Sequence, residues 1–161
     1  RVPKRDLVVF PHRLAPEKQP DIFRDLATML PDYEFFLCQE QDLSKPEYRQ
    51  IMAEAKIVFS ANLQETLGIS WYEGTLVNTI PLVPNRLSYA EMSVDAFAYP
   101  SEWTQSEKSY NRYKKHLANR IQYLMENYDS YLPAVQKQRN KLEKKFFSGE
   151  KIYRTINNGM D

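Results

Sequence analysis

Residues 57–83 decide the fold, and they read IVFSANLQETLGISWYEGTLVNTIPLV. The stretch opens on a short apolar run at 57–60 and closes on another at 80–83, both without clean polar alternation. Such runs are typical of strands buried on both faces of a parallel sheet. Between them, residues 69–76 resemble a helix, and Gly68 stands where a loop would turn into that helix. The stretch therefore predicts a strand–loop–helix–strand unit.

The same alternation extends toward the N-terminus. Two further apolar runs lie at residues 7–10 and 34–38. Residues 21–30 place their apolar side chains on one helical stripe, and the preceding proline suits a first helical turn. Ser44 and Glu47 are spaced as a capping box before another apolar helical face. The pattern predicts an α/β fold, a Rossmann-like parallel sheet with helices on both faces.

The pattern changes after a fifth short strand expected near residues 97–99. Residues 106–128 and 133–147 read as two C-terminal helices, and Pro133 starts the second. No internal repeat or linker divides the chain. We therefore expect residues 1–161 to form a single domain.

Composition favours an ordinary globular protein. Hydrophobic residues make up 42% and charged residues 27% of the 161 residues. The apolar runs are too short to span a bilayer, and the basic N-terminus is followed by no apolar stretch, so we expect neither a membrane anchor nor a signal peptide. Cys38 is the only cysteine, which excludes an internal disulfide and favours a cytoplasmic setting. Because the sequence begins at Arg1 rather than methionine, we expect it to be part of a longer protein.

Charge is unevenly distributed along the chain. Residues 1–104 contain 10 Lys and Arg against 15 Asp and Glu, whereas residues 105–161 contain 12 against 6. The basic end could face an anionic partner, or it could be the solvated surface of two long helices. The cations best placed for an anionic partner are Lys137, Arg139, Lys141, Lys144 and Lys145.

The loop after the first strand contains two cations, Arg13 and Lys18, at the entrance to the next helix. Ligands of open parallel sheets bind beyond the carboxyl ends of the strands. A helix N-terminus attracts anions through its free N–H groups and its dipole. Together these features form a candidate diphosphate clamp, although cations in loops are often simply solvated. His12 could touch substrate or be satisfied by backbone groups.

The loop after the third strand contains the second candidate group. Glu65 would stand before the helix, where it can accept hydrogen bonds from sugar hydroxyls, and Glu73 would lie on the helix. Gly68 permits a close backbone approach, so the N–H groups of Gly68 and Ile69 would face a ligand. The alternative is two exposed glutamates on a surface helix.

Other chemistries fit the sequence poorly. There is no Asp-x-Asp metal motif, and two histidines with one cysteine cannot build a typical zinc site. Neither Gly-x-Gly-x-x-Gly, a Walker loop, nor Gly-x-Ser-x-Gly occurs. We expect no metal and no cofactor.

The ordered set of Arg13, Lys18, Glu65, Gly68 and Glu73 resembles the donor-binding domain of retaining GT-B glycosyltransferases, the family that includes glycogen-synthase-like and mannosyltransferase-like enzymes. The resemblance covers about residues 5–130, and a loop at 84–91 occupies the place of the family's third site segment. It implies that Arg13 and Lys18 bind the donor diphosphate, that Glu65 orients the sugar as the catalytic group, and that Glu73 binds the ribose. It also implies a nucleotide sugar as substrate and an acceptor-binding N-terminal domain as partner.

The sequence departs from the family at two points. Pro11 and His12 replace the usual glycine before Arg13, and Asn78 stands where the later helix usually ends on glycine. Asparagine can adopt the left-handed conformation at a helix end. Short segments around residues 12–18 and 84–91 also resemble tRNA-queuosine mannosyltransferases, and phage sugar transferases that act on modified DNA bases are a further resemblance. They suggest a nucleic-acid acceptor.

The sequence thus predicts the donor half of a retaining, metal-independent glycosyltransferase, inactive as an isolated fragment. Two alternatives stay open. The chain could be a non-catalytic α/β module that binds nucleic acid through its basic C-terminal helices, or a degenerate transferase that serves as a scaffold.

Overall fold

The computed structural model describes residues 2–64 and 68–146. Its centre is a five-stranded sheet in which every pair of neighbouring strands is parallel, in the order β2-β1-β3-β4-β5. The strands are β1 Arg5–Phe10, β2 Glu34–Leu37, β3 Ala55–Phe59, β4 Ile80–Pro84 and β5 Ala98–Tyr99. The predicted α/β, Rossmann-like class is confirmed.

Six α-helices and five short 3₁₀ turns connect and cover these strands in the described part of the chain. The helices are α1 Pro20–Met29, α2 Lys45–Glu54, α3 Ile69–Leu76, α4 Tyr89–Met92, α5 Glu107–Glu126 and α6 Leu132–Phe146. The turns are η1 Pro16–Lys18, η2 Cys38–Glu40, η3 Asp95–Phe97, η4 Ser101–Thr104 and η5 Tyr128–Tyr131. The predicted capping box is present, since the Ser44 backbone N–H donates to Glu47 and the Glu47 N–H donates to the Ser44 hydroxyl.

Element ends differ from the sequence prediction by one or two residues. Cys38, expected at the end of the second strand, begins η2, and Phe97, expected in the fifth strand, ends η3. Both side chains are nevertheless buried, as an apolar run predicts. The residue at which a strand ends depends on its hydrogen bonds to neighbouring strands, and an apolar run in the sequence does not predict those bonds.

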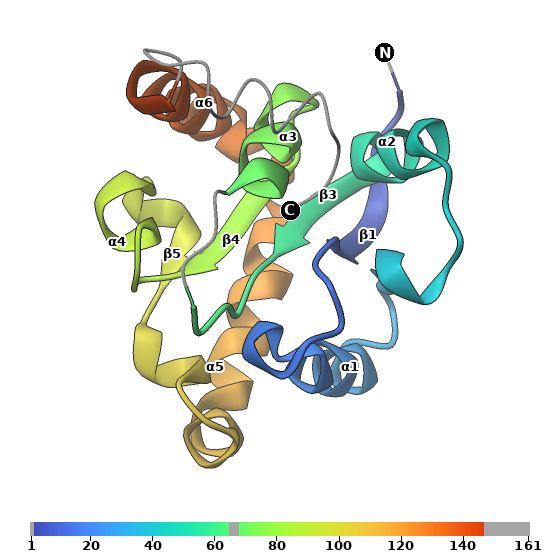
Figure 1. The fold of residues 1–161 in the computed structure, drawn as a ribbon. Helices are drawn as coiled ribbons and strands as arrows, with labels where there is room; N and C mark the ends of the chain where they lie inside the picture. The colour runs from blue at the N-terminus through green and yellow to red at the C-terminus, as the bar shows by residue number, and fades with distance from the viewer. Residues whose placement is uncertain (1, 65–67, 147–161) are drawn as a thin grey trace.

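Successive strand side chains point to opposite faces of the sheet, and both faces are covered. Val8 and Phe10 belong to the larger core with α1 and α5, whereas Leu7 and Val9 pack with α2. A third cluster joins α3, α4 and α6 through Trp71, Tyr89 and Leu142 among others. Figure 1 shows α1 and α5 on one side of the sheet and α2 and α3 on the other. This double burial is why the strand sequences show no polar alternation.

Candidate functional site

The sheet order creates a topological switch point between β1 and β3. The chain leaves β1 through α1 on one face toward β2, and it leaves β3 through α3 on the other face toward β4. Ligands of such sheets bind beyond the carboxyl ends of these two strands, between the loops that follow them, and this position is the candidate crevice. The backbone N–H of Leu63 donates to the carbonyl of Glu17 at 2.8 Å, which joins the two loops at the crevice.

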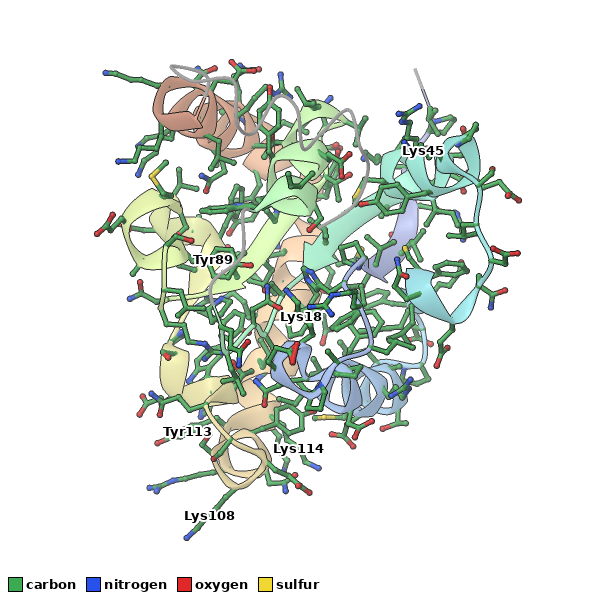
Figure 2. All side chains as sticks on the ribbon, viewed as in Figure 1. Lys18, Lys45, Tyr89, Lys108, Tyr113 and Lys114 are labelled. Atoms are coloured by element: carbon green, nitrogen blue, oxygen red, sulfur yellow. The ribbon has the colours of Figure 1, made fainter. Side chains whose placement is uncertain are left out.

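Lys18 is buried in this crevice. It ends η1, is only 6% exposed, and its backbone N–H donates to the Ala15 carbonyl. Figure 2 shows it near the centre of the molecule, beside the carboxyl ends of β1 and β3. Within residues 2–64 and 68–146, no carboxylate forms an ion pair with it. A buried ammonium without a counter-charge is costly, so the site is suited to an anion.

Arg13 lies on the same loop but in a different environment. Its side chain is 67% exposed, and its guanidinium is 3.8 Å from the carboxylate of Glu17, a long ion pair. The structure therefore places both predicted cations on one loop, one buried and one in solvent. Arg13 keeps the rotameric freedom to turn toward a ligand, whereas Lys18 is already in place.

Gly68 starts α3 in a conformation that favours glycine. Its φ of 73° and ψ of 26° are left-handed, and an added Cβ would lie 3.1 Å from the Trp71 ring. Ile69 is fully buried, so its side chain belongs to the core and only its backbone could face a ligand. The first N–H groups of a helix have no partner within it, and those of α3 start beyond the carboxyl end of β3. Glu65, the predicted catalytic residue, lies outside the described residues.

Glu73 lies on α3 and faces α2. One carboxylate oxygen accepts a hydrogen bond from the Tyr48 hydroxyl at 3.2 Å. At about 1.5 Å of rise per residue, Glu73 is about 7 Å along the helix from Gly68. Tyr48 is a buried residue of α2, so this hydrogen bond holds the Glu73 carboxylate against α2. At the other end of α3, Asn78 has a φ of 62°, as the sequence predicted for a residue in the place of glycine.

His12 is an internal link between the two loops. Its ring is 2% exposed, Nε2 lies 3.1 Å from the Phe59 carbonyl oxygen, and the ring packs edge-on against Phe10. This is the backbone-satisfied alternative that the sequence allowed. Trp71 and Tyr72 are core residues. Burial, followed by the hydrogen bond to Glu143, raises the pKa of Tyr72 to about 12.

Sequence reasoning missed a polar clamp at the rim of the crevice. The Arg86 guanidinium donates to the carbonyls of Asn62, Ala61 and Ser101 at 2.7, 2.9 and 2.9 Å. Gln19 adds bonds from Nε2 to Ala61 and Thr104. These bonds join the loops after β1, β3, β4 and β5, and burial lowers the pKa of Arg86. An arginine after a strand was the available signal, but its partners are carbonyls that no motif marks.

The sequence also missed two buried polar atoms beside α3. Asn62 Oδ1 and Trp71 Nε1 are buried and have no hydrogen-bond partner among the described residues. The Asn62 amide nitrogen donates to the Tyr89 hydroxyl at 2.8 Å, which lies 3.0 Å from Ser60 Oγ. Orphaned buried polar atoms are rare in folded proteins, and a ligand is one explanation for them. Asparagine before a glycine-containing loop was the only sequence signal.

A hollow lies at the opposite end of the strands from this crevice. It measures about 940 Å³ and is lined by Lys4, Lys56, Asn78 and Tyr128 among others, near the amino ends of the strands. Lys4 donates to the Ala55 carbonyl and the Thr79 hydroxyl, and Lys56 pairs with Asp6. Its cations are thus already used by the fold, and we do not assign it a ligand despite its size.

Two of the five predicted α6 cations support the fold. Arg139 donates through Nε to the Thr75 carbonyl at 2.9 Å and through Nη2 to the Asn78 side chain, so it satisfies the end of α3. Lys141 Nζ lies 3.5 Å from the Ser93 carbonyl, at the end of α4. The expectation that these two face an anionic partner is weakened, because the guanidinium and the ammonium bind helix carbonyls. No group of three potential metal ligands occurs within the described residues, and no helix there is long and apolar enough to cross a membrane.

Comparison with known proteins shows the fold. No protein-family model matches the sequence, and no curated protein matches it closely enough to report. Among solved structures, TarM from S. aureus is 15% identical with a TM-score of 0.66, over 98% of this chain and 35% of that chain. Anabaena HepE in complex with UDP is 15% identical with a TM-score of 0.64, over 96% of this chain and 49% of that chain.

The catalytic domain of Arabidopsis thaliana starch synthase IV, bound to ADP and acarbose, is 14% identical with a TM-score of 0.62. The similarity covers 94% of this chain and 38% of the starch synthase chain. The chain therefore spans between about a third and a half of these solved chains, which are GT-B glycosyltransferases. The predicted likeness to the GT-B architecture is confirmed at the level of the fold, and the likeness to tRNA-queuosine mannosyltransferases stays a prediction.

Proposed function

We propose that this chain binds the nucleotide-sugar donor of a glycosyltransferase in the crevice between β1 and β3. The observation that carries the proposal is Lys18, a lysine only 6% exposed whose charge no described carboxylate neutralises. The crevice supplies a cation on one side and the start of α3 on the other. A diphosphate would satisfy both, since helix N-termini and lysines are the usual partners of phosphate.

The remaining roles follow from position. Lys18 and a reoriented Arg13 hold the diphosphate and stabilise the charge that develops on the departing nucleotide. The N–H groups of Gly68 and Ile69 add donors at the same point. Glu73 holds the ribose, which requires its carboxylate to bind the sugar hydroxyls in addition to the Tyr48 hydroxyl.

The reaction is glycosyl transfer with retention of configuration. Glu65 orients the donor sugar as the catalytic residue of this half. No metal is invoked, because two cations and a helix dipole would neutralise the diphosphate. The acceptor would be bound by an N-terminal domain of the longer protein. The isolated chain should therefore bind the donor without turning it over.

Calorimetry with UDP, ADP and GDP and their sugar conjugates tests the donor proposal. We expect one site, at which Glu73→Ala weakens nucleoside diphosphate and conjugate alike, and Glu65→Ala weakens chiefly the conjugate. Lys45→Ala is the matched control, because Lys45 is an exposed lysine on α2 away from the crevice. No binding by any of the six ligands, or equal affinity in all variants, would contradict the proposal.

Nucleic acid is the second candidate partner, either as the acceptor or as the ligand of a non-catalytic module. The observation that favours it is a set of cations on the outer face of α5 that form no ion pair with described residues. With full-length enzyme and labelled donor, label in DNA or tRNA supports the acceptor role. Label only in polysaccharide, at rates that do not respond to salt, refutes it.

A further inference from the structure

The outer face of α5 is a continuous basic stripe. Its side chains recur at helical spacing, are exposed or half-buried, and lie opposite the buried residues of the same helix. The cations and the histidine of this stripe are Lys108, Arg112, Lys115, His116 and Arg120. Figure 2 shows Lys108 projecting from the lower end of α5. The stripe covers about 18 Å of helix at about 1.5 Å per residue.

These charges are not neutralised within the described fold. No Asp or Glu occurs in α5 between Glu107 and Glu126. The ion pair that α5 does form, Lys114 with Asp25 at 3.6 Å, lies toward α1 and away from the stripe. Arg120 forms no ion pair with a described carboxylate, and its hydrogen bond to the Ala98 carbonyl is long, at 3.5 Å. Surface cations this close together repel one another unless an anionic partner is present.

Aromatic rings reach the surface at the same stripe. Phe59, Tyr99, Trp103 and His116 form a consecutive stack with ring centroids 6.0, 6.1 and 5.8 Å apart and interplanar angles of 21° or less. The stack begins in the core and ends at His116, which is exposed. Tyr113 lies beside His116, with centroids 6.1 Å apart.

Each of the two arginines pairs with a ring. Arg120 lies over Trp103 and Arg112 over Tyr113, both at 5.4 Å from guanidinium to ring centroid. Rings that alternate with arginines present flat apolar surfaces and fixed positive charge at one place. Phosphate groups bind to such cations, and unstacked bases stack on such rings.

We propose that this stripe, with the exposed ring of His116 at the end of the stack and Tyr113 beside it, is a docking surface for single-stranded nucleic acid. Bases splayed from a single strand can extend the ring stack at His116, whereas bases inside a duplex cannot leave their stack without cost. A duplex would use the cations alone and leave the rings without a role.

The stripe is continuous with the donor crevice. Trp103 belongs to η4, and η4 is held to the loops of the crevice by the bonds of Gln19 to Thr104 and of Arg86 to Ser101. A strand bound on α5 would thus run to the rim of the crevice. The proposal rests on the second candidate function, nucleic-acid binding, and does not require donor binding.

Fluorescence anisotropy with a labelled twelve-residue oligo-dT tests the proposal on this chain. The test variant is Arg112→Ala with Lys115→Ala, and the matched control is Lys45→Ala with Arg49→Ala on the exposed face of α2, which removes the same charge and the same two residue types. We expect the α5 pair to lower affinity at least tenfold and to reduce the log–log salt slope by about 1.4, since each lost phosphate contact contributes about 0.7. The control pair should stay within twofold of the unchanged protein.

Two further measurements distinguish failure of the α5 site from failure of the second candidate function. An abasic strand of the same length should bind at least fivefold more weakly than oligo-dT, and His116→Ala should remove that preference, because stacking needs bases. Binding of UDP should be unchanged in the α5 pair. Equal binding of the abasic strand, or equal loss in the α5 pair and the α2 control pair, overturns the α5 site alone. No oligonucleotide binding at low salt overturns the second candidate function as well.

Discussion

Replacing Lys18 by methionine should make the protein more stable and less able to bind a diphosphate. Methionine matches the length of the lysine stem and fills the same space. In the absence of ligand, Lys18 is only 6% exposed and has no described carboxylate partner, so removing its charge removes a desolvation cost. We expect the free energy of unfolding to rise by about 1 kcal/mol, which raises Tm by about 2–4 °C for a chain of this size.

The same substitution should change the free energy of diphosphate binding more than it changes the free energy of unfolding. A charge-assisted contact to phosphate contributes about 1.5–3 kcal/mol, so its loss should weaken UDP or ADP binding by about 10- to 150-fold. At a ligand concentration of about 100 times Kd, the unchanged protein gains about 2.7 kcal/mol of stability, whereas a variant weakened about 100-fold gains about 0.4 kcal/mol. The two proteins should therefore exchange their order of stability when ligand is added.

Urea unfolding with and without nucleotide, together with calorimetry, measures both effects. Lys45→Met serves as the control, and both its stability and its nucleotide affinity should match the unchanged protein, because surface substitutions usually change stability by less than about 0.5 kcal/mol. A Lys18→Met protein that is less stable by more than about 1 kcal/mol and binds nucleotide normally would refute the reasoning. Lys18 would then be a packing residue.

Three further predictions follow from single contacts. Gly68→Ala forces a Cβ into a left-handed backbone at 3.1 Å from the Trp71 ring, so urea unfolding should show a loss of about 1–2 kcal/mol, and an unchanged midpoint would contradict the φ of 73°. Arg86→Lys removes the fork that binds carbonyls of two loops, so it should cost about 2 kcal/mol in the same assay, whereas Arg49→Lys on the exposed face of α2 should cost nothing measurable. Burial raises the pKa of Cys38 from 9.0 to about 12, so its contribution to stability is complete below about pH 9 and is lost as pH rises toward 12. Unfolding free energy should fall between pH 9 and 11, less steeply in Cys38→Ala, and a rise over that interval would be the contrary result.

The sequence predicts the elements well because burial leaves a direct mark on composition. Each apolar run became a strand to within two residues, and the spacing of Ser44 and Glu47 fixed the start of α2. Strand order is different, because the runs do not say that β3 pairs with β1 rather than β2. The order is a finding of the structure, and it places the loop that contains Lys18 beside the loop that leads to α3.

The roles of individual side chains were harder to predict from the sequence than the helices and strands. Arg13 and Lys18 look alike in the sequence, yet one is in solvent and the other is buried, because η1 turns the chain inward only at its end. Arg139 looked like a surface charge, but it satisfies the end of α3. Arg86 reaches carbonyls 15 to 25 residues away along the chain, which no local pattern contains. Position in a motif therefore identifies the loop, and the fold decides what each side chain does there.

The crevice combines rigid walls with unsatisfied polar groups, and this combination argues for a ligand. Arg86 and Gln19 hold the loops together with carbonyl bonds, so the walls cannot simply relax to satisfy what they enclose. Yet Lys18, which is 6% exposed, forms no ion pair with a described carboxylate, and the Oδ1 of Asn62 is buried without a described hydrogen-bond partner. In a free scaffold, substitutions that remove such groups would raise stability at no cost. A fold that keeps both groups beside the first turn of α3 is better explained by an anionic, hydrogen-bonding ligand that satisfies them on binding.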